Sequence, residues 1–436
     1  MSTDTLIILG IAGVMVLALV LPFYLRQRRL EHATDRAAEV AQRFGLSEPV
    51  SLHPVVSAEA CIGTGNCIAA CPEEHVLGIR HGQAVTVSPS RCIGHGLCAR
   101  ACPTEAIQLV FGSAKRGVEI PYIKGNFETN VPGLYIIGEL GGMGLIRNAF
   151  EQGRQCIEGI AKLPKAPTGL LDVLIIGCGP AGLSASVNCL HHGLRSATIE
   201  KEDVGGTVRY FPRKKVVMTA PVKVPGYGRL AFRELRKEEL IDVWADIVAK
   251  TGLEVRTEEA VSAVTPVGGR FEVTSSKGRY AAQRVVLAIG RRGIPRKLGV
   301  PGENLPKVIY SLLEPEVFQG DRVLVVGGGD SAVEAALALS EQDGNRVTVS
   351  YRRDRFSRLK PRNLERIEEA LAAHRIDLLW SSSVLAITPQ SVAIRDQAER
   401  EIEIANDVVA IFAGGELPTP FLRACGVAFD TKFGTP

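Results

Sequence analysis

Residues 172–200, DVLIIGCGPAGLSASVNCLHHGLRSATIE, decide the fold. An apolar run leads into Gly177-x-Gly179-x-x-Gly182, and a helix-like segment and a second apolar run ending at Glu200 follow. Glycines at this spacing allow a tight turn and let the backbone approach a pyrophosphate at a helix N-terminus. The acid at the end of the second run is placed to bind ribose hydroxyls. The stretch therefore predicts a Rossmann-like dinucleotide-binding unit, the alternative being a purely structural glycine turn.

A second unit of the same kind lies at residues 321–358, DRVLVVGGGDSAVEAALALSEQDGNRVTVSYRRDRFSR. The first unit has Glu200 at the end of its second apolar run. The second unit has no acid at that place, and arginines follow instead, which suit the 2′-phosphate of NADPH. We therefore expect NADPH rather than NADH, the alternative being that the arginines form a solvated charge cluster. The residues predicted to bind this cofactor are Gly327, Gly329, Asp330, Ser331, Ala332, Arg352 and Arg353.

Two cysteine runs precede these units: CIGTGNCIAACP at residues 61–72 and CIGHGLCARACP at residues 92–103. Bacterial iron–sulfur runs read C-x2-C-x2-C-x3-C-P, and the last cysteine of each run ligates the other cluster. The predicted metal ligands are Cys61, Cys67, Cys71, Cys92, Cys98, Cys102 and His95. The crossover rule assigns Cys61, Cys67 and Cys102 to one cluster, and Cys71, Cys92 and Cys98 to the other.

Each run lacks its second cysteine, and Thr64 and His95 stand at the vacant positions. A threonine hydroxyl is a poor iron ligand, so we expect a three-iron cluster or an exchangeable corner there. An imidazole does bind iron in Rieske centres, so His95 is either a ligand or a spacer. Structural zinc and a metal-free, degenerate module are the alternatives to iron–sulfur clusters.

Residues 5–24, TLIILGIAGVMVLALVLPFY, carry no charge, and Arg26, Arg28 and Arg29 follow them. Twenty helical residues span about 30 Å, the thickness of a hydrocarbon core. The positive-inside rule places Met1 outside and the rest of the chain in the cytoplasm. We expect a single-pass anchor in the inner, or cytoplasmic, membrane; a cleaved signal peptide is the alternative.

The numbers of charged residues and of cysteines limit the functional class. The 436 residues carry 51 basic and 47 acidic side chains, and a net charge of +4 gives no reason to expect nucleic acid as a partner. Six of the ten cysteines lie in metal-type spacing, which favours a reducing compartment. Cys156, Cys178, Cys189 and Cys425 are scattered, and we interpret them as buried free thiols.

The tandem units resemble the thioredoxin-reductase-like branch of the two-dinucleotide-binding-domain flavoproteins. Gly205-Gly206-Thr207, the run LAIG at residues 287–290 and the run IFAGG at residues 411–415 carry this resemblance, and residues 357–361 and 414–422 are similar to bacillithiol-disulfide-reductase-like members. The resemblance implies FAD at the first unit. The relatives' C-x-x-C is absent, and Ala181 stands where a bacillithiol-type cysteine is expected, so a disulfide substrate loses its usual chemistry here.

The segment that closes the FAD site in the family is missing after Pro436 and is found instead at residues 129–153, with Gly138-Glu139 in place of the usual Gly-Asp. We expect a circular permutation joined by residues 162–169, because both chain ends of the family lie in the FAD domain. An unrelated strand–helix pair over residues 113–162 is the alternative. The FAD-binding residues implied are Gly177, Gly179, Pro180, Ala181, Gly182, Glu200, Gly206, Thr207, Gly290, Gly138 and Glu139.

The predicted architecture is α/β: two Rossmann-like domains for FAD and NAD(P), a small α+β ferredoxin domain and one N-terminal transmembrane helix. The predicted segments are 1–30 (anchor), 31–56 (juxtamembrane helix and linker), 57–112 (ferredoxin), 113–165 (permuted FAD segment), 166–294 (FAD), 295–415 (NAD(P)H) and 416–436 (return to FAD).

These features predict a membrane-anchored NADPH-linked flavin/iron–sulfur oxidoreductase. Its partner is expected to be an electron-transfer protein or a membrane redox carrier, and the chain is expected to form a homodimer. No catalytic side chain is expected, because the cofactors supply the chemistry. A reductase of a small disulfide or a quinone with a structural ferredoxin domain, and a membrane redox sensor, are the alternative functions.

Overall fold

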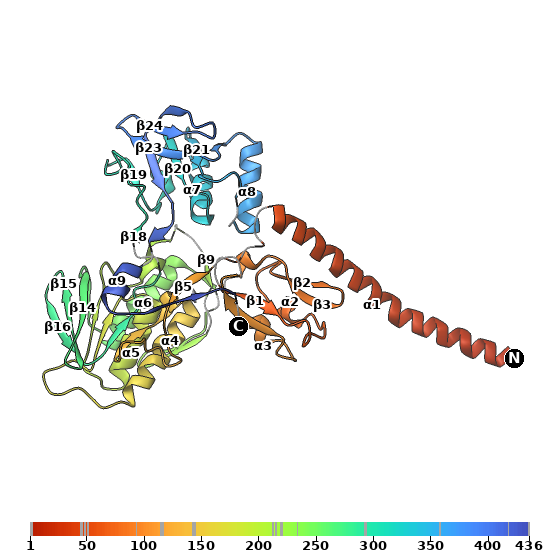
Figure 1. Ribbon diagram of the computed structural model, residues 1–436, viewed down its shortest axis with the longest axis horizontal. Coiled ribbons are helices and arrows are strands. Elements are labelled where there is room, and N and C mark those ends of the chain that lie inside the picture. The colour runs from red at the N-terminus through yellow and green to blue at the C-terminus, as the bar shows by residue number, and fades with distance from the viewer. Residues whose placement is uncertain are drawn as a thin grey trace. The chain divides into compact units, whose positions relative to one another are not determined.

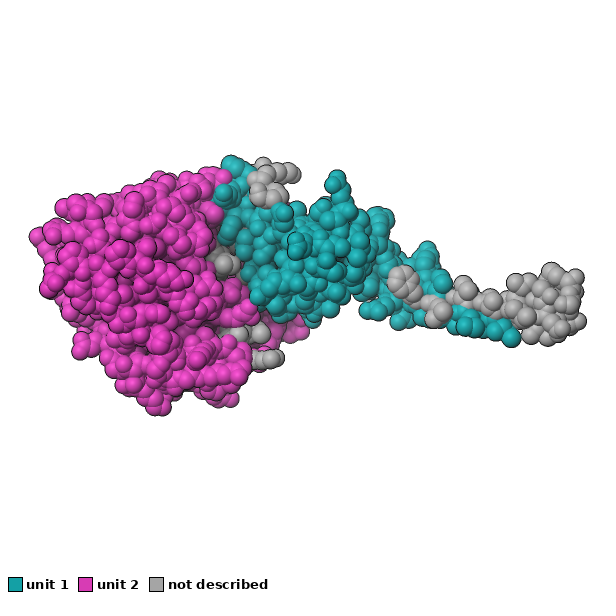
Figure 2. All heavy atoms as spheres, turned by 90° about the horizontal axis from the view of Figure 1, so that it is seen from below, with its two compact units in different colours: residues 1–118, 432–436 teal, residues 119–431 magenta. Residues whose placement is uncertain are grey.

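The computed structural model divides the chain into two compact units, residues 1–118 with 432–436 and residues 119–431 (Figures 1 and 2). The described residues are 3–434 apart from 44–46, 48, 50–51, 93, 114–116, 142–144, 212, 214–215, 219–220, 233, 292–293, 357–358 and 417.

The first unit begins with one long helix, α1 (Thr3–Arg43), so the segment predicted as a separate juxtamembrane helix continues the predicted anchor without a break. The predicted anchor, residues 5–24, includes side chains that lie outside the described residues. Among those described, no helix is both long enough and apolar enough to span a bilayer. The predicted transmembrane helix is therefore not confirmed.

The second half of α1 packs on the ferredoxin domain, a tertiary contact that the prediction of a juxtamembrane helix did not include. Thr34 is 5% exposed, and its Oγ1 accepts a hydrogen bond from the Ile79 N–H at 3.0 Å. A Cβ on Gly78 would lie 2.5 Å from this oxygen, so glycine makes room for the threonine. Asp35 forms an ion pair with Arg80 at 2.7 Å.

The ferredoxin domain is built from two similar halves. Strand β1 (Leu52–Val56) pairs antiparallel with β4 (Ile107–Phe111), and β2 (Leu77–Arg80) forms a hairpin with β3 (Gln83–Thr86). Short helices α2 (Asn66–Ala70) and α3 (Leu97–Arg100) follow the two cysteine loops, and a 3-10 turn, η1 (Pro89–Arg91), precedes the second. Strand β1 lies before residue 57, where the ferredoxin domain was predicted to begin, and it completes the outer strand pair.

The second unit contains a five-stranded parallel sheet in the order β13-β8-β7-β17-β6. Its strands are β6 (Leu134–Ile136), β7 (Val173–Ile176), β8 (Ser196–Ile199), β13 (Val255–Arg256) and β17 (Val285–Leu287). The helices of this part are α4 (Ile146–Ala161), α5 (Pro180–His191), α6 (Lys237–Thr251) and α9 (Thr419–Ala424). Residues 134–136 therefore add an edge strand to the sheet that carries the first glycine motif.

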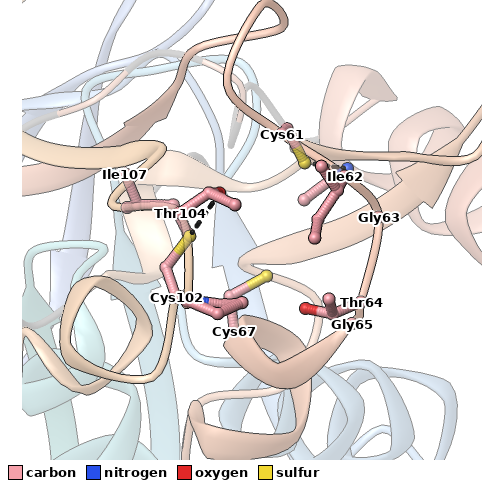
Figure 3. Close-up of a pocket in the computed structure, with 11 residues that line it drawn as sticks. Cys61, Ile62, Gly63, Thr64, Gly65, Cys67, Cys102, Thr104 and Ile107 are labelled. Carbon is pink, nitrogen blue, oxygen red and sulfur yellow. Dashed lines mark hydrogen bonds between the residues drawn. The ribbon is translucent and has the colours of Figure 1, made fainter.

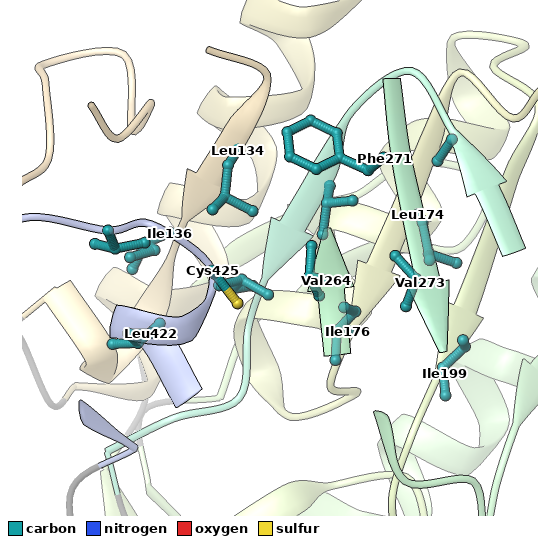
Figure 4. Close-up of a cluster of buried hydrophobic side chains, with 14 of the residues drawn as sticks. Leu134, Ile136, Leu174, Ile176, Ile199, Val264, Phe271, Val273, Leu422 and Cys425 are labelled. Atoms are coloured by element: carbon teal, nitrogen blue, oxygen red, sulfur yellow. The ribbon is translucent and has the colours of Figure 1, made fainter. Parts of the chain in front are cut away.

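A three-stranded antiparallel meander, β14 (Val261–Val267), β15 (Arg270–Ser275) and β16 (Arg279–Ala282), covers the core of this sheet. Figure 4 shows Leu134 and Leu174 of the sheet beside Phe271 of the meander and Leu422 of α9. Leu134, Leu174 and Leu422 are at most 1% exposed. Because residues near both ends of the second unit share this core, they fold as one domain.

The same plan is repeated in the NAD(P) part, where the parallel order is β19-β26-β20-β21-β22. The strands are β19 (Val308–Ile309), β20 (Arg322–Val326), β21 (Arg346–Ser350), β22 (Ile376–Leu379) and β26 (Val408–Ile411), with helices α7 (Asp330–Ser340) and α8 (Pro361–Ala372). The meander of this part is β23 (Ser383–Ile387), β24 (Ser391–Arg395) and β25 (Glu401–Ala405).

Two further pairs consist of short strands. β18 (Ile294–Pro295) pairs with β27 (Gly415–Glu416) at the crossover between the two parts of the second unit, and β5 (Val118–Pro121) pairs with β28 (Phe429–Lys432). The remaining short elements are η2 (Gly138–Gly141), η3 (Gly206–Tyr210), η4 (Pro315–Val317), β9 (Val216–Met218), β10 (Val222–Val224), β11 (Gly228–Leu230) and β12 (Glu234–Arg236). The predicted α/β architecture with two dinucleotide-binding folds is confirmed.

Candidate cofactor sites

The first glycine turn joins β7 to α5 by close backbone contact. Gly177 has φ +98°, and a Cβ there would lie 2.6 Å from the Ala288 carbonyl oxygen. A Cβ on Gly182 would lie 1.9 Å from the Gly177 oxygen, so the third glycine lets the helix approach the strand. By contrast, a Cβ on Gly179, which caps α5, would meet only the Gly206 Cα at 3.9 Å. The N-terminal amides of α5 thus fit the pyrophosphate of a dinucleotide.

Glu200 lies at the carboxyl end of β8 and is 8% exposed. Its Oε2 accepts a hydrogen bond from the Cys178 N–H at 2.6 Å, and its Oε1 accepts one from the Glu202 N–H at 3.1 Å. Each carboxylate oxygen keeps a further lone pair. Glu200 therefore holds the glycine turn in place and retains acceptors for ribose hydroxyls.

Five other predicted FAD residues lie in this turn or in elements next to it. A Cβ on Gly206, at the start of η3, would lie 3.1 Å from the Gly179 Cα, and Thr207 follows within the same 3-10 turn. Gly290 lies shortly after β17, at the sheet edge where the carboxyl ends of parallel strands meet. The half-buried Pro180 and the buried Ala181 begin α5.

The segment before the first glycine motif also reaches the turn. A Cβ on Gly138 would lie 3.0 Å from the Ala181 Cβ, and Glu139 follows in η2. The Gly138 N–H donates to Gln152 Oε1 at 2.7 Å. A Cβ on Gly153 would lie 2.4 Å from the Ala181 oxygen, so α4 packs directly on α5. Sequence reasoning missed Gln152, for which no motif gave a signal.

The second glycine turn has the same geometry. Gly327 has φ +144°, and a Cβ there would lie 2.5 Å from the Phe412 oxygen. Gly329 caps α7, and Ala332 is fully buried where the helix meets the strand. Ser331 is exposed in the first turn of this helix.

Asp330 anchors the loop that carries the arginines. Its Oδ1 accepts hydrogen bonds from the Lys360 N–H at 2.9 Å and from Asn363 Nδ2 at 2.8 Å. Asp330 therefore has a structural role in addition to its predicted role as a direct cofactor contact. The anchored loop includes Ser357 and Arg358, which lie outside the described residues.

Arg352 and Arg353 follow β21, so the structure places both at the carboxyl end of the sheet. Arg352 is exposed and Arg353 is half-buried. The loop is supported by aromatic contacts that sequence reasoning missed: the Tyr351 ring stacks on Phe356 with centroids 5.7 Å apart, and Phe356 meets Trp380 edge-on at 4.8 Å. A Cβ on Gly328 would lie 2.4 Å from the Tyr351 ring, so the same ring also covers the glycine turn.

The ferredoxin domain has two hollows lined by cysteine. Site A is Cys61, Cys67, Cys102 and Thr64, around an atom-free space of about 280 Å³ that opens partly to solvent. In Figure 3 the three sulfurs and the Thr64 hydroxyl face this space. Backbone N–H groups of Ala84 and Ala106 donate to the sulfurs of Cys61 and Cys102, each at 3.3 Å.

Site B is Cys71, Cys92, Cys98 and His95, around a second hollow that also opens partly to solvent. The Gly94 N–H donates to the Cys92 sulfur at 3.4 Å. The structure thus brings each set of three cysteines together across the two runs, as the crossover rule requires. Within the described part of the chain, no group of three or more His, Cys, Asp or Glu side chains lies close enough together to hold a single metal ion. An iron–sulfur cluster is larger than a single ion, so its ligands stand farther apart.

The thiols respond to their surroundings in two ways. Burial raises the pKa of Cys92 to about 11 and also raises the pKa of Cys67, Cys71 and Cys98. A hydrogen bond with the Thr104 hydroxyl lowers the pKa of Cys102. Buried thiols resist ionisation, whereas iron binds the thiolate and removes that penalty. Three sulfurs around a hollow with N–H donors fit an iron–sulfur cluster.

The four remaining cysteines are buried, as predicted. Burial raises the pKa of Cys189 to about 12 and that of Cys425 to about 11. Cys425 lies in the core cluster of Figure 4. Burial therefore makes these thiols poorly reactive.

Comparisons with known proteins identify both halves. The family described as pyridine nucleotide-disulphide oxidoreductase matches residues 174–436, and the 4Fe-4S dicluster domain matches residues 53–103. These matches imply FAD with NAD(P)H and iron–sulfur clusters, which confirms the predicted cofactors.

Two curated relatives and one solved structure illustrate what the chain is similar to. The bacilliredoxin reductase of Bacillus subtilis is 32% identical over 269 residues, 60% of this chain and 82% of that protein. A ferredoxin–NADP reductase of Ignicoccus hospitalis is 36% identical over 201 residues, 46% of this chain and 62% of that protein. The bacillithiol disulfide reductase from Bacillus cereus is 28% identical with a TM-score of 0.54, covering 60% of this chain and 82% of that one.

Proposed function

The chain belongs to the pyridine nucleotide-disulphide oxidoreductase family, and from this premise we propose that it transfers electrons between NADPH and a one-electron carrier. The observation that carries the proposal is one chain with two dinucleotide turns and two three-cysteine hollows. FAD exchanges hydride with NADPH and single electrons with iron–sulfur clusters, so the two halves are chemically complementary.

The residues of the chain have distinct tasks in this proposal. The α5 amides and Glu200 bind the pyrophosphate and ribose of FAD. The α7 amides bind the pyrophosphate of the nicotinamide cofactor, and Arg352 with Arg353 bind its 2′-phosphate, which favours NADPH. The thiols of sites A and B hold the clusters, and their N–H donors tune them.

The likeness to bacilliredoxin reductase favours disulfide reduction as a second candidate function. Two features speak against it. The buried Ala181 replaces the cysteine expected in a bacillithiol-type turn, and the cysteines outside sites A and B are all buried. The relatives named ferredoxin–NADP reductase fit the electron-carrier proposal better.

We further propose that residues 129–161 are a circularly permuted part of the FAD domain. The support is the parallel pairing of β6 with β17, the approach of Gly138 to Ala181, and a family match that begins only at residue 174. Asp172 supports the joining segment: its Oδ1 accepts from the Ala166 N–H at 2.6 Å and its Oδ2 from the Arg195 N–H at 2.8 Å.

The membrane anchor and the cytoplasmic orientation are also proposals. Their support is the uncharged stretch over residues 5–24 followed by Arg26, Arg28 and Arg29. Carbonate extraction of membranes from cells expressing the full chain tests the anchor, and release of the protein into the soluble fraction would contradict it. We also propose that the chain forms a homodimer. Light scattering of detergent-solubilised protein tests this.

The experiment for the proposed function is turnover of anaerobically purified protein with NADPH and a ferredoxin or an artificial one-electron acceptor. We expect brown protein containing FAD, iron and sulfide, and turnover on the order of 10 per second. The matched control replaces Cys61, Cys67, Cys92 and Cys98 by serine. If the control reduces disulfide or quinone at the wild-type rate while neither protein reduces the carrier, the second candidate function is correct.

A further inference from the structure

The two cysteine loops present one side chain each to their hollow by the same backbone device. Thr64 lies between Gly63 (φ +73°) and Gly65 (φ +72°), and His95 lies between Gly94 (φ +78°) and Gly96 (φ +70°). Left-handed glycines on both sides of a residue bend the loop around it. Thr64 lines site A and His95 lines site B, so each stands where the fourth ligand of a cluster belongs.

The two side chains differ in what they offer iron. Thr64 is exposed, and its neutral hydroxyl already accepts a long hydrogen bond of 3.5 Å from the Asn66 N–H. A neutral hydroxyl donates little charge to a metal, whereas imidazole is a common ligand of iron. His95 is half-buried, and its loop is tied by Arg100, whose guanidinium donates to the His95 carbonyl oxygen at 3.4 Å.

From these observations we infer that the two clusters are chemically different. Site B is closed by three cysteines and the imidazole of His95. Site A is held by three cysteines alone, and its fourth iron occupies an open, exchangeable corner beside Thr64. Site A is therefore a labile ferrous-ion site, and site B is not. The inference rests on the proposed cluster binding and goes beyond it by assigning a ligand set to each site.

The test compares the wild type with Thr64→Cys, His95→Cys and His95→Ala after anaerobic reconstitution. One readout is exchange of cluster iron with added 57Fe(II), followed by Mössbauer spectroscopy. The other is the nitrogen coupling of a reduced cluster in pulsed EPR of protein labelled with 15N-histidine. Neither readout depends on turnover, and the cysteine variants restore an ordinary ligand at the same place.

We expect about one exchangeable iron of about eight per chain in the wild type, none in Thr64→Cys, and about two in His95→Ala. We also expect a histidine nitrogen coupling in the wild type and in Thr64→Cys that both His95 variants lose. The inference is overturned if Thr64→Cys exchanges iron as the wild type does, or if the nitrogen coupling is absent from the wild type. Iron content near zero in every protein overturns the proposed function together with this inference.

Discussion

Helix α4 carries two glycines for which the same substitution is expected to have opposite effects. Gly153 faces α5: an added Cβ would lie 2.4 Å from the Ala181 oxygen and 2.9 Å from the Ala185 nitrogen. Gly159 is exposed in the same helix and has nothing within 4 Å of an added Cβ. The pair Gly153→Ala and Gly159→Ala therefore isolates the packing of residues 129–161 on the FAD turn.

The magnitudes follow from two opposing terms. Alanine in place of glycine favours a helix interior by about 1 kcal/mol, and this gain is common to both variants. At Gly153 a Cβ meets backbone atoms, so α4 must withdraw from α5, and overpacking of this kind costs about 3 kcal/mol at its upper end. We expect Gly153→Ala to lower the free energy of unfolding by about 2 kcal/mol and Gly159→Ala to raise it by about 1 kcal/mol.

The assay is thermal unfolding of the holoprotein, followed by release of flavin fluorescence. For a domain of this size, Gly153→Ala should lower the midpoint by about 4–8 °C and Gly159→Ala should raise it by about 2–4 °C. Gly153→Ala should also retain less FAD through gel filtration, because Ala181 belongs to the FAD turn. Equal midpoints and equal FAD content for the two variants would refute the placement of α4 against α5, and with it the proposed permutation.

Three further predictions follow from single contacts. Replacing Arg352 and Arg353 by alanine should raise the KM for NADPH about 10–100-fold, because each substitution removes a charge-assisted hydrogen bond to the 2′-phosphate. The KM for NADH should stay nearly unchanged, because NADH has no 2′-phosphate. Equal changes of KM for both cofactors would contradict this prediction. Burial acts to raise the pKa of Asp172, but hydrogen bonds from a guanidinium and from backbone N–H groups outweigh it and hold that pKa below its ordinary value. The stability it contributes is thus present above the unfolded pKa of about 4 and is lost as pH falls through the lower folded pKa. Asp172→Asn should cost about 2–3 kcal/mol at neutral pH and flatten this acid limb in denaturant titrations, whereas parallel limbs for variant and wild type would count against the prediction. Gly78→Ala should push Thr34 away and weaken the packing of α1 on the hairpin. Limited proteolysis within residues 27–43 should then become about tenfold faster, which corresponds to about 1.4 kcal/mol of lost packing free energy. An unchanged cleavage rate would disprove that packing.

Features whose physics is local could be predicted from the sequence. The turns at Gly177 and Gly327 were recognisable because a strand, a glycine spacing and a helix lie next to one another in the chain. The grouping of Cys61 and Cys67 with Cys102 was also predictable, because the crossover is a property of the repeated run itself. The structure places the residues of each glycine turn in close contact, and it places the three cysteines around one hollow.

Contacts between distant parts of the chain could not be predicted in this way. Gln152 holds Gly138, and Thr34 of α1 fits above Gly78, but no local pattern distinguishes either polar residue from its neighbours. The Tyr351 ring over the second glycine turn is likewise a tertiary contact. The segment over residues 31–43 was interpreted as a juxtamembrane helix because it is polar and rich in helix formers, but nothing in its sequence indicated that its side chains bind the hairpin.

The central claim is that electrons pass between NADPH and the clusters through flavin held by the same chain. It is tested most directly by mixing NADPH anaerobically with the oxidised holoprotein, following the flavin by absorbance and the clusters by freeze-quench EPR. We predict that the flavin bleaches and the cluster signals change within one turnover, on the order of 0.1 s. A flavin that bleaches while the clusters stay oxidised for minutes would contradict the account.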